Sequence, residues 1–151
     1  MYKTIIVPID LTHAEQGKPM LEVAKSLGDK GAKIILINVV EDVPARVTAE
    51  LPAGAHEKIL EHAKAELKAM AAGASSDAEA VVRDGHPPTA IIGLAEESGA
   101  DLIIVASHRP GWQDYLLGST AARVVRHAQC SVLVVRLAVT DVKRVARLAF
   151  F

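Results

Sequence analysis

Short, continuous apolar runs alternate along this chain with longer segments in which apolar residues recur every three or four positions. Runs rich in Ile, Leu and Val are typical of buried parallel strands, and the longer spacing is typical of amphipathic helices. The runs predict strands at 4–9, 33–40, 79–83, 102–106 and 131–136. The periodic segments predict helices at 19–27, 55–72, 88–98 and 118–128.

This alternation of strands and helices predicts an α/β fold, in which helices cover both faces of a parallel sheet. The segment 41–53 has two prolines and no periodic pattern, so we expect a surface connection there. The tail, 137–151, is expected to be either an amphipathic helix packed on a neighbouring subunit or a flexible end. The positions expected to face the core from the second and fourth helices are Ile59, Leu60, Ala63, Leu67, Met70, Val124, Val125 and Ala128.

Composition narrows the class of protein. Half of the 151 residues are hydrophobic but only five are aromatic, so aliphatic side chains must build the core of a single domain. The formal net charge of −1 gives no general attraction to nucleic acid or to anionic membranes. No run reaches membrane-spanning length and the N-terminus has no signal-peptide layout, so we expect a cytoplasmic protein. Its single cysteine excludes an internal disulfide, and no Cys/His spacing indicates a metal site.

The stretch 101–127 has the layout of an anion-binding site. A buried strand is followed by a polar loop with His108 and Arg109, and then by Gly118-Ser119-Thr120, where a helix is predicted to begin. Backbone N–H groups and the positive end of a helix dipole would face the loop. The hydroxyls of Ser119 and Thr120 are also expected to accept hydrogen bonds from the first turn of that helix.

At these residues the chain resembles the universal stress protein family, whose nucleotide motif is Gly-x2-Gly-x9-Gly-[Ser/Thr], followed by a helix and a last strand. The matching text here begins at Ala106-Ser107-His108-Arg109 and ends at Gly118-Ser119. Ala106 and Arg109 replace the first two glycines, and the loop is one residue shorter. Loops of the Ser-His-Arg-Pro type resemble a subgroup that still binds adenine nucleotides. The resemblance covers residues 2–136.

The resemblance implies a doubly wound, Rossmann-like sheet of five parallel strands in the order 3-2-1-4-5, formed by residues 1–136, with 137–151 as a separate tail. Strands one and four are then neighbours where the winding reverses, and ligands bind outside the carboxyl ends of such strands. The implied ligand is ATP, or AMP or ADP, with Mg²⁺ on the phosphates. The implied contacts come from Pro8, Ile9, Asp10, Val39, Ala106, Ser107, His108, Arg109, Gly118, Ser119 and Thr120.

Several of these residues have an ordinary structural role as an alternative. The family uses the aspartate that matches Asp10 for ribose, but an aspartate after a strand also caps turns. Val39 would supply backbone to adenine, and it is equally an ordinary core valine. His108 and Arg109 suit phosphate oxygens and also suit an exposed basic loop. The segment 118–120 suits phosphate and also suits simple helix capping.

Three functions fit this pattern: a regulatory ATP-binding protein that acts through an unknown partner protein, a slow ATPase on the same scaffold, and a nucleotide-free dimerisation module. The sequence has neither a Walker lysine loop nor a G-x-S-x-G elbow, and it shows no nucleophile with a base. The residues that favour the first function are Asp10 and 118–120.

Because strand 131–136 is apolar and comes last, we expect it at a sheet edge, pairing two copies into a homodimer. The alternative is that 137–151 covers this edge.

Overall fold

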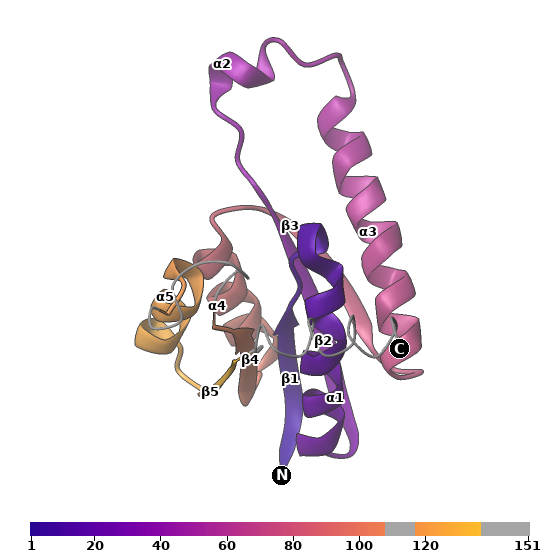
Figure 1. The fold of residues 1–151 in the computed structure, drawn as a ribbon, viewed down its shortest axis with the longest axis vertical. Coiled ribbons are helices and arrows are strands. Elements are labelled where there is room, and N and C mark those ends of the chain that lie inside the picture. The colour runs from indigo at the N-terminus through magenta and orange to yellow at the C-terminus, as the bar shows by residue number, and fades with distance from the viewer. Residues whose placement is uncertain (108–116, 137–151) are drawn as a thin grey trace, which may run out of the picture.

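The computed structural model describes residues 1–107 and 117–136, and it shows a five-stranded sheet (Figure 1). Every neighbouring pair of strands is parallel, and the order is β3-β2-β1-β4-β5. This confirms the predicted doubly wound α/β fold. The strands are β1 (Tyr2–Pro8), β2 (Gly28–Glu41), β3 (Glu79–Gly85), β4 (Leu102–Ala106) and β5 (Ser131–Val135).

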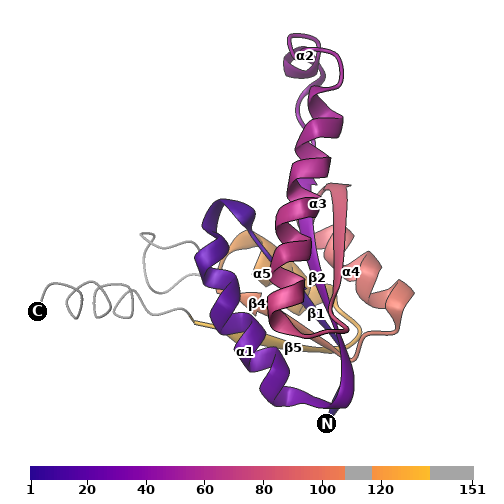
Figure 2. The same ribbon diagram turned by 90° about the vertical axis from the view of Figure 1, so that its right-hand side faces the viewer.

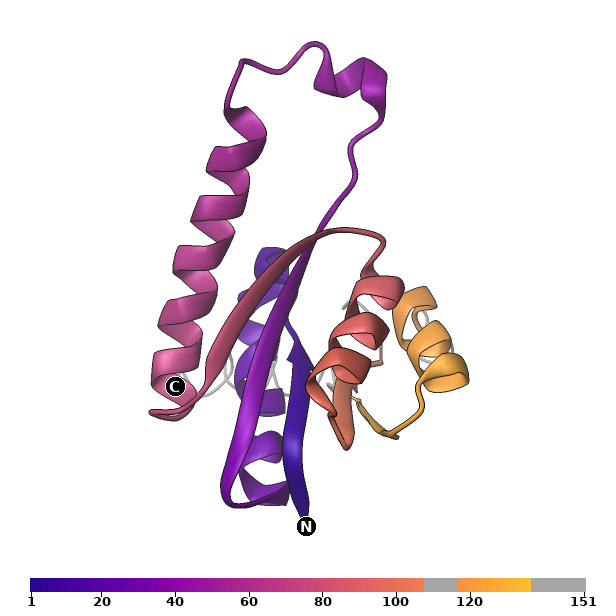
Figure 3. The ribbon, with the colours of Figure 1, turned by 180° about the vertical axis from the view of Figure 1, so that it is seen from behind.

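Helices cover both faces of the sheet: in Figure 3, α1 lies behind β1 and β2, and α4 lies in front of β4. Alternate strand residues point to opposite faces, so that Ile5 and Val7 pack with α1 and α3, whereas Ile6 packs with α4 and α5. No helix within the described residues is long and apolar enough to cross a membrane. The helices are η1 (Leu11–Gln16), α1 (Gly17–Leu27), α2 (Ala45–Thr48), α3 (Ala55–Ala74), α4 (Pro87–Ser98) and α5 (Ser119–His127).

The connection between β2 and α3 stands out from the body of the protein. In Figure 2, α3 rises well beyond the sheet toward α2. Residues 41–54 are exposed throughout, as expected for a surface connection, although they contain the short helix α2. β2 spans 14 residues and is longer than predicted at both ends.

Two predicted core positions are wrong. Ile59 is 45% exposed because it lies in the first turns of α3, which project past the sheet, and the buried stripe of that helix runs from Ala63 to Ala74. Val125 is 47% exposed, whereas Val124 is fully buried. Consecutive residues of a helix point about 100° apart, and α5 packs through the side that carries Ala121 and Val124, so Val125 points away from the core.

Candidate functional site

The sheet opens at its switch point, between β1 and β4. The middle of β1 pairs with the first two residues of β4 and the pairing then stops, whereas β1 pairs with β2, and β4 with β5, up to the last residues of β1 and β4. Beyond Ile6 and Ile103 the two strands are no longer paired, and we call this gap in strand pairing the parting. It lies at the carboxyl edge, where doubly wound sheets bind ligands. The last paired positions are Ile6↔Ile103, Pro8↔Ile37 and Ala106↔Val135.

Asp101 holds the amino ends of the same two strands together. Its carboxylate accepts hydrogen bonds from the backbone N–H of Lys3 at 2.8 Å and of Thr4 at 2.9 Å, and its own N–H donates to the Thr4 carbonyl at 3.0 Å. Burial by itself raises the pKa of this carboxyl, but the donated N–H bonds outweigh it and lower the pKa below its ordinary value. The strands are thus clamped at one end and part at the other.

Asp10 follows β1 directly and lies at the carboxyl edge of the sheet. Its Oδ1 accepts hydrogen bonds from the Thr12 N–H at 3.0 Å and the Thr12 hydroxyl at 2.6 Å, so it caps the turn that begins η1. The structural alternative for Asp10 is therefore present. Its Oδ2 makes no hydrogen bond within the described residues, so one acceptor stays available for a ligand.

The backbone just before Asp10 is fixed by a residue that sequence reasoning missed. Asn38 is buried in β2, and its Nδ2 donates to the Ile9 carbonyl at 2.9 Å. The N–H of Ile9 donates to the Ile37 carbonyl at 2.8 Å. Ile9 is buried and Pro8 is half-buried, so these two residues anchor the backbone that leads into Asp10. The available signal for Asn38 was a lone amide inside an apolar run.

On the other side of the parting, a hydrogen bond closes the base of the loop that follows β4. Ser107 is 3% exposed, its N–H donates to the Val135 carbonyl at 3.0 Å, and its carbonyl accepts from the N–H of Gly118 at 2.6 Å. Ala106, half-buried, ends β4 just before it. His108 and Arg109 lie outside the described residues, between the two ends of this closed loop.

Helix α5 begins at Ser119, as predicted, but the predicted hydroxyl cap is wrong. Gly118 is the N-cap residue, and no side chain accepts a hydrogen bond there. Ser119 and Thr120 are the first two helical residues, where a side chain lies too far along the helix to cap it. The first turn also has no acidic residue. Its N–H groups and the positive end of the dipole can therefore receive an anion.

Val39 does not lie at the end of β2, because this strand extends one residue beyond the predicted end at residue 40. The strand continues for two residues to Glu41 because β3 pairs along it, with Val39 opposite Arg83 and Glu41 opposite Gly85. Val39 is half-buried and packs on the α4–α5 side of the sheet. A backbone contact to a ligand at this position would therefore use a strand that is already paired on its β3 side.

A shallow groove of about 500 Å³ lies elsewhere, between α3 and the edge strand β3. Lys64 in it donates from Nζ to the Ala80 carbonyl, and a lysine placed so is a common cover for an exposed strand edge. In the part of the chain that the structure describes, no group of three or more His, Cys, Asp or Glu side chains is placed to hold a metal ion. The groove is lined by Leu60, Glu61, Lys64, Ala65, Lys68, Val82 and Asp84.

Comparison with known proteins bears on this geometry. The family model of the universal stress proteins matches residues 1–136. The chain belongs to the universal stress protein family. It is 34% identical over 142 residues to Universal stress protein G of Escherichia coli O157:H7, with 90% of this chain and 100% of that protein covered.

Solved structures agree with this family membership. The hypothetical protein MJ0577 superposes with a TM-score of 0.77 at 26% identity, covering 91% of this chain and 98% of that one. A universal stress protein crystallised in complex with cAMP superposes with a TM-score of 0.57 at 28% identity, covering 89% and 96%. The parting between β1 and β4 thus lies in a universal stress protein fold. A related protein with this fold was crystallised with a cyclic adenine nucleotide.

Proposed function

We propose that this protein binds an adenine nucleotide at the parting between β1 and β4 and passes its bound state to a partner protein. The observation that carries the proposal is the convergence of two features at one edge of the sheet. The uncapped first turn of α5 offers N–H donors, and Asp10 offers an unused carboxylate oxygen. The complex of a related universal stress protein with cAMP supports the ligand class.

Each part of the ligand has a counterpart in the chain. Phosphate oxygens suit the N–H groups at 118–120 together with Ser107 and the basic side chains of His108 and Arg109, in a loop of the Ser-His-Arg-Pro type. Ribose hydroxyls suit Asp10, a hydrogen-bond acceptor. Adenine suits the backbone near Val39. We propose ATP as the nucleotide, with AMP and ADP as weaker alternatives, and Mg²⁺ held by the phosphates rather than by protein side chains.

The remaining parts of the proposal concern the whole chain. Residues 1–136 form the nucleotide-binding domain, 137–151 form a separate tail, and the protein works in the cytoplasm as a homodimer paired through β5. All four apolar residues of this edge strand, from Val132 to Val135, are only half-buried in one chain. This incomplete burial is what supports pairing of the edge with a second copy.

Mass spectrometry of the small molecules released on denaturing the purified protein tests the nucleotide directly, together with calorimetric titration of ATP, AMP and adenosine. An adenine nucleotide in the released fraction and saturable binding are expected. Neither would be seen for a nucleotide-free dimerisation module. Timed hydrolysis of ATP separates the regulatory function from a slow ATPase, since a regulatory protein leaves the nucleotide intact over many binding lifetimes.

A further inference from the structure

The structure leaves two apolar surfaces without a partner. We call the first the arm, residues 41–61, which comprises the connection through α2 and the first turns of α3. The second is the α5 surface, residues 117–127. Apart from Met1, every large apolar side chain that is at least 37% exposed within the described residues lies on one of these two surfaces. These side chains are Val43, Val47, Leu51, Ile59, Leu117 and Val125.

The apolar residues of the arm form a row. Val43, Val47 and Leu51 recur four residues apart along the chain: Val43 precedes α2, Val47 lies in it, and Leu51 ends the turns that continue it. Those turns are held by hydrogen bonds from the N–H of Glu50 to the Val47 carbonyl at 3.1 Å and from Leu51 to Thr48 at 3.2 Å. Residues four apart lie on one side of a helical segment, so Val47 and Leu51 face the same way, and Val43 lies just before the extended N-cap residue Pro44.

The two surfaces carry opposite charge. The arm has five acidic residues against two basic ones, and all are exposed. The α5 surface has Arg123, Arg126 and His127 exposed and no acidic residue. None of these charged groups takes part in an ion pair between described residues. The acidic residues are Glu41, Asp42, Glu50, Glu57 and Glu61, and the basic residues of the arm are Arg46 and Lys58.

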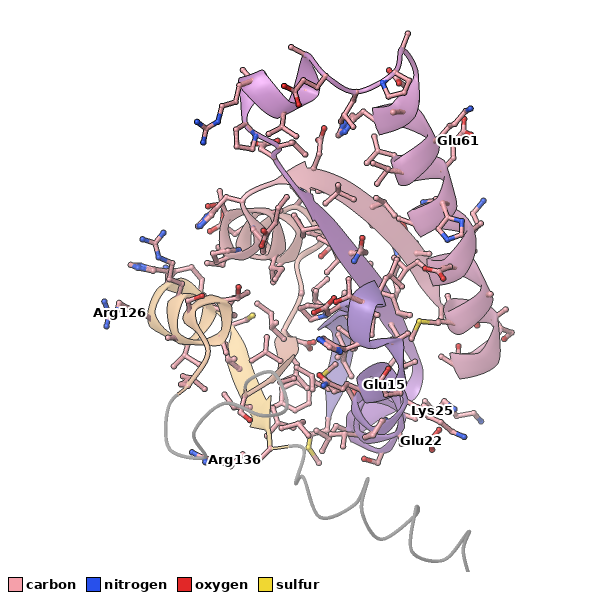
Figure 4. The ribbon with its side chains drawn as sticks, turned by 45° about the horizontal axis from the view of Figure 1, so that its top comes forward. Glu15, Glu22, Lys25, Glu61, Arg126 and Arg136 are labelled. Atoms are coloured by element: carbon pink, nitrogen blue, oxygen red, sulfur yellow. The ribbon has the colours of Figure 1, made fainter. Side chains whose placement is uncertain are left out.

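The two surfaces of one chain belong to elements that cover opposite faces of the sheet. The helical part of the arm continues into α3, which packs with α1 on one face of the sheet, whereas α5 packs with α4 on the opposite face. His56 also pairs with Asp84 of β3 at 3.3 Å, which ties the start of α3 to the body. In Figure 4, Arg126 on α5 and Glu61 on α3 both point away from the body of the protein.

We propose that the arm of one copy docks on the α5 surface of a second copy. The row of Val43, Val47 and Leu51 covers Val125 and Leu117, and the acidic residues surround this contact opposite the arginines. Complementary charge of this kind sets partner choice and register. Because each copy carries both surfaces, the contact forms twice about a two-fold axis. It is separate from pairing through β5 and does not depend on bound nucleotide.

Charge reversal on each surface in the full chain tests the proposal. One variant carries Asp42→Lys and Glu50→Lys, which flank the row of the arm, and the other carries Arg123→Glu and Arg126→Glu. Each alone places like charges across both contacts, so its sedimentation mass is expected to fall to half the wild-type value. An equimolar mixture pairs opposite charges in both contacts again and is expected to restore the wild-type mass.

Controls separate this contact from general effects of charge. Glu15→Lys with Glu22→Lys makes the same change in charge on α1 and η1, and it is expected to keep the wild-type mass. Added salt is expected to lower the wild-type mass, because the paired charges lie near solvent. Circular dichroism checks that each variant is folded.

Three results would overturn the proposal. The first is that the wild type sediments as a monomer. The second is that both charge-reversed variants keep the wild-type sedimentation mass. The third is a mixture that stays at half mass although each variant has lost assembly, because it would mean that the surfaces do not recognise each other. If Val134→Lys did not change the sedimentation mass, this would contradict only the pairing through β5 and not the contact between the arm and the α5 surface.

Discussion

At the scale of single residues, the candidate site includes a carboxylate that also maintains the fold. Asp10 caps the turn at η1 through Oδ1 and leaves Oδ2 without a hydrogen bond in the described structure. Capping orients the side chain, so its free oxygen is presented at the carboxyl end of β1 at little entropic cost. The structural and functional roles predicted as alternatives for Asp10 are therefore compatible.

Asp10→Ala is expected to weaken nucleotide binding by about 1–3 kcal/mol, the usual range for a lost hydrogen bond to a charged group. It is also expected to lower the free energy of unfolding by about 1 kcal/mol, because the cap is lost. Calorimetry and urea unfolding measure the two effects. Thr12→Val is the matched control, since it weakens the turn and keeps the carboxylate. An equal loss of affinity in both variants would mean that Asp10 acts through the turn alone.

Asp101 predicts a pH dependence of stability. Its folded pKa is lowered, so its carboxylate contributes stability above the unfolded pKa of about 3.9, and this contribution is lost as pH falls through the folded pKa. Asp101→Asn is expected to lower the free energy of unfolding at neutral pH by about 1–3 kcal/mol. It should also flatten the decline below about pH 4. Urea unfolding across this range checks it, and parallel pH profiles for the two proteins would contradict the prediction.

Some of these residues could be found from the sequence and others could not. Asp10 and the polar residues that follow strand 102–106 gave a local signal, because a polar group directly after a buried strand stands at the ligand-binding edge. Asn38 and Asp101 gave none that periodicity detects. Their hydrogen-bond partners lie 29 and 97–98 residues away, so their roles appear only when the strands are aligned.

At the scale of elements, strand and helix identities followed the hydrophobic pattern, and several ends did too, such as both ends of β4, but the ends of β2 did not. β2 continues to Glu41 because β3 pairs along it, and no local residue specifies that length. The end of α4 is different, because Gly99 adopts φ 63° there and its N–H donates to the carbonyls of Ala95 and Glu96. A residue without Cβ fits this left-handed conformation, so the end of α4 is fixed locally.

Two glycine substitutions near this helix should act in opposite directions. Gly99→Ala is expected to lower the free energy of unfolding by about 1 kcal/mol, because alanine is strained at positive φ. Gly93→Ala lies inside α4, where an added Cβ would meet nothing nearer than Glu97 Oε1 at 4.0 Å, and it is expected to raise stability by about 0.5–1 kcal/mol. Thermal or urea unfolding measures both, and stabilisation by Gly99→Ala would contradict the assigned cap.

At the scale of the whole molecule, topology brings the site together and leaves surfaces for assembly. The order β3-β2-β1-β4-β5 makes β1 and β4 neighbours although about a hundred residues separate them. The clamp by Asp101 at one end and the parting at the other follow from that order. The same order puts β5 at an edge, where its outer backbone groups have no neighbouring strand among the described residues.

Val134→Lys is expected to halve the sedimentation mass, because a lysine on the edge strand opposes pairing of β5 with its copy. Val134 is half-buried against the α4–α5 side, so the variant also needs a check of its fold by circular dichroism. Gln129→Lys adds the same charge at an exposed position just before β5 and is expected to leave the mass unchanged. Truncation after Arg136 is expected to leave the pairing intact. If truncation changed the assembly while Val134→Lys did not, we would conclude that 137–151 covers the edge. A wild-type protein that sediments as a monomer at tens of micromolar would exclude the dimer.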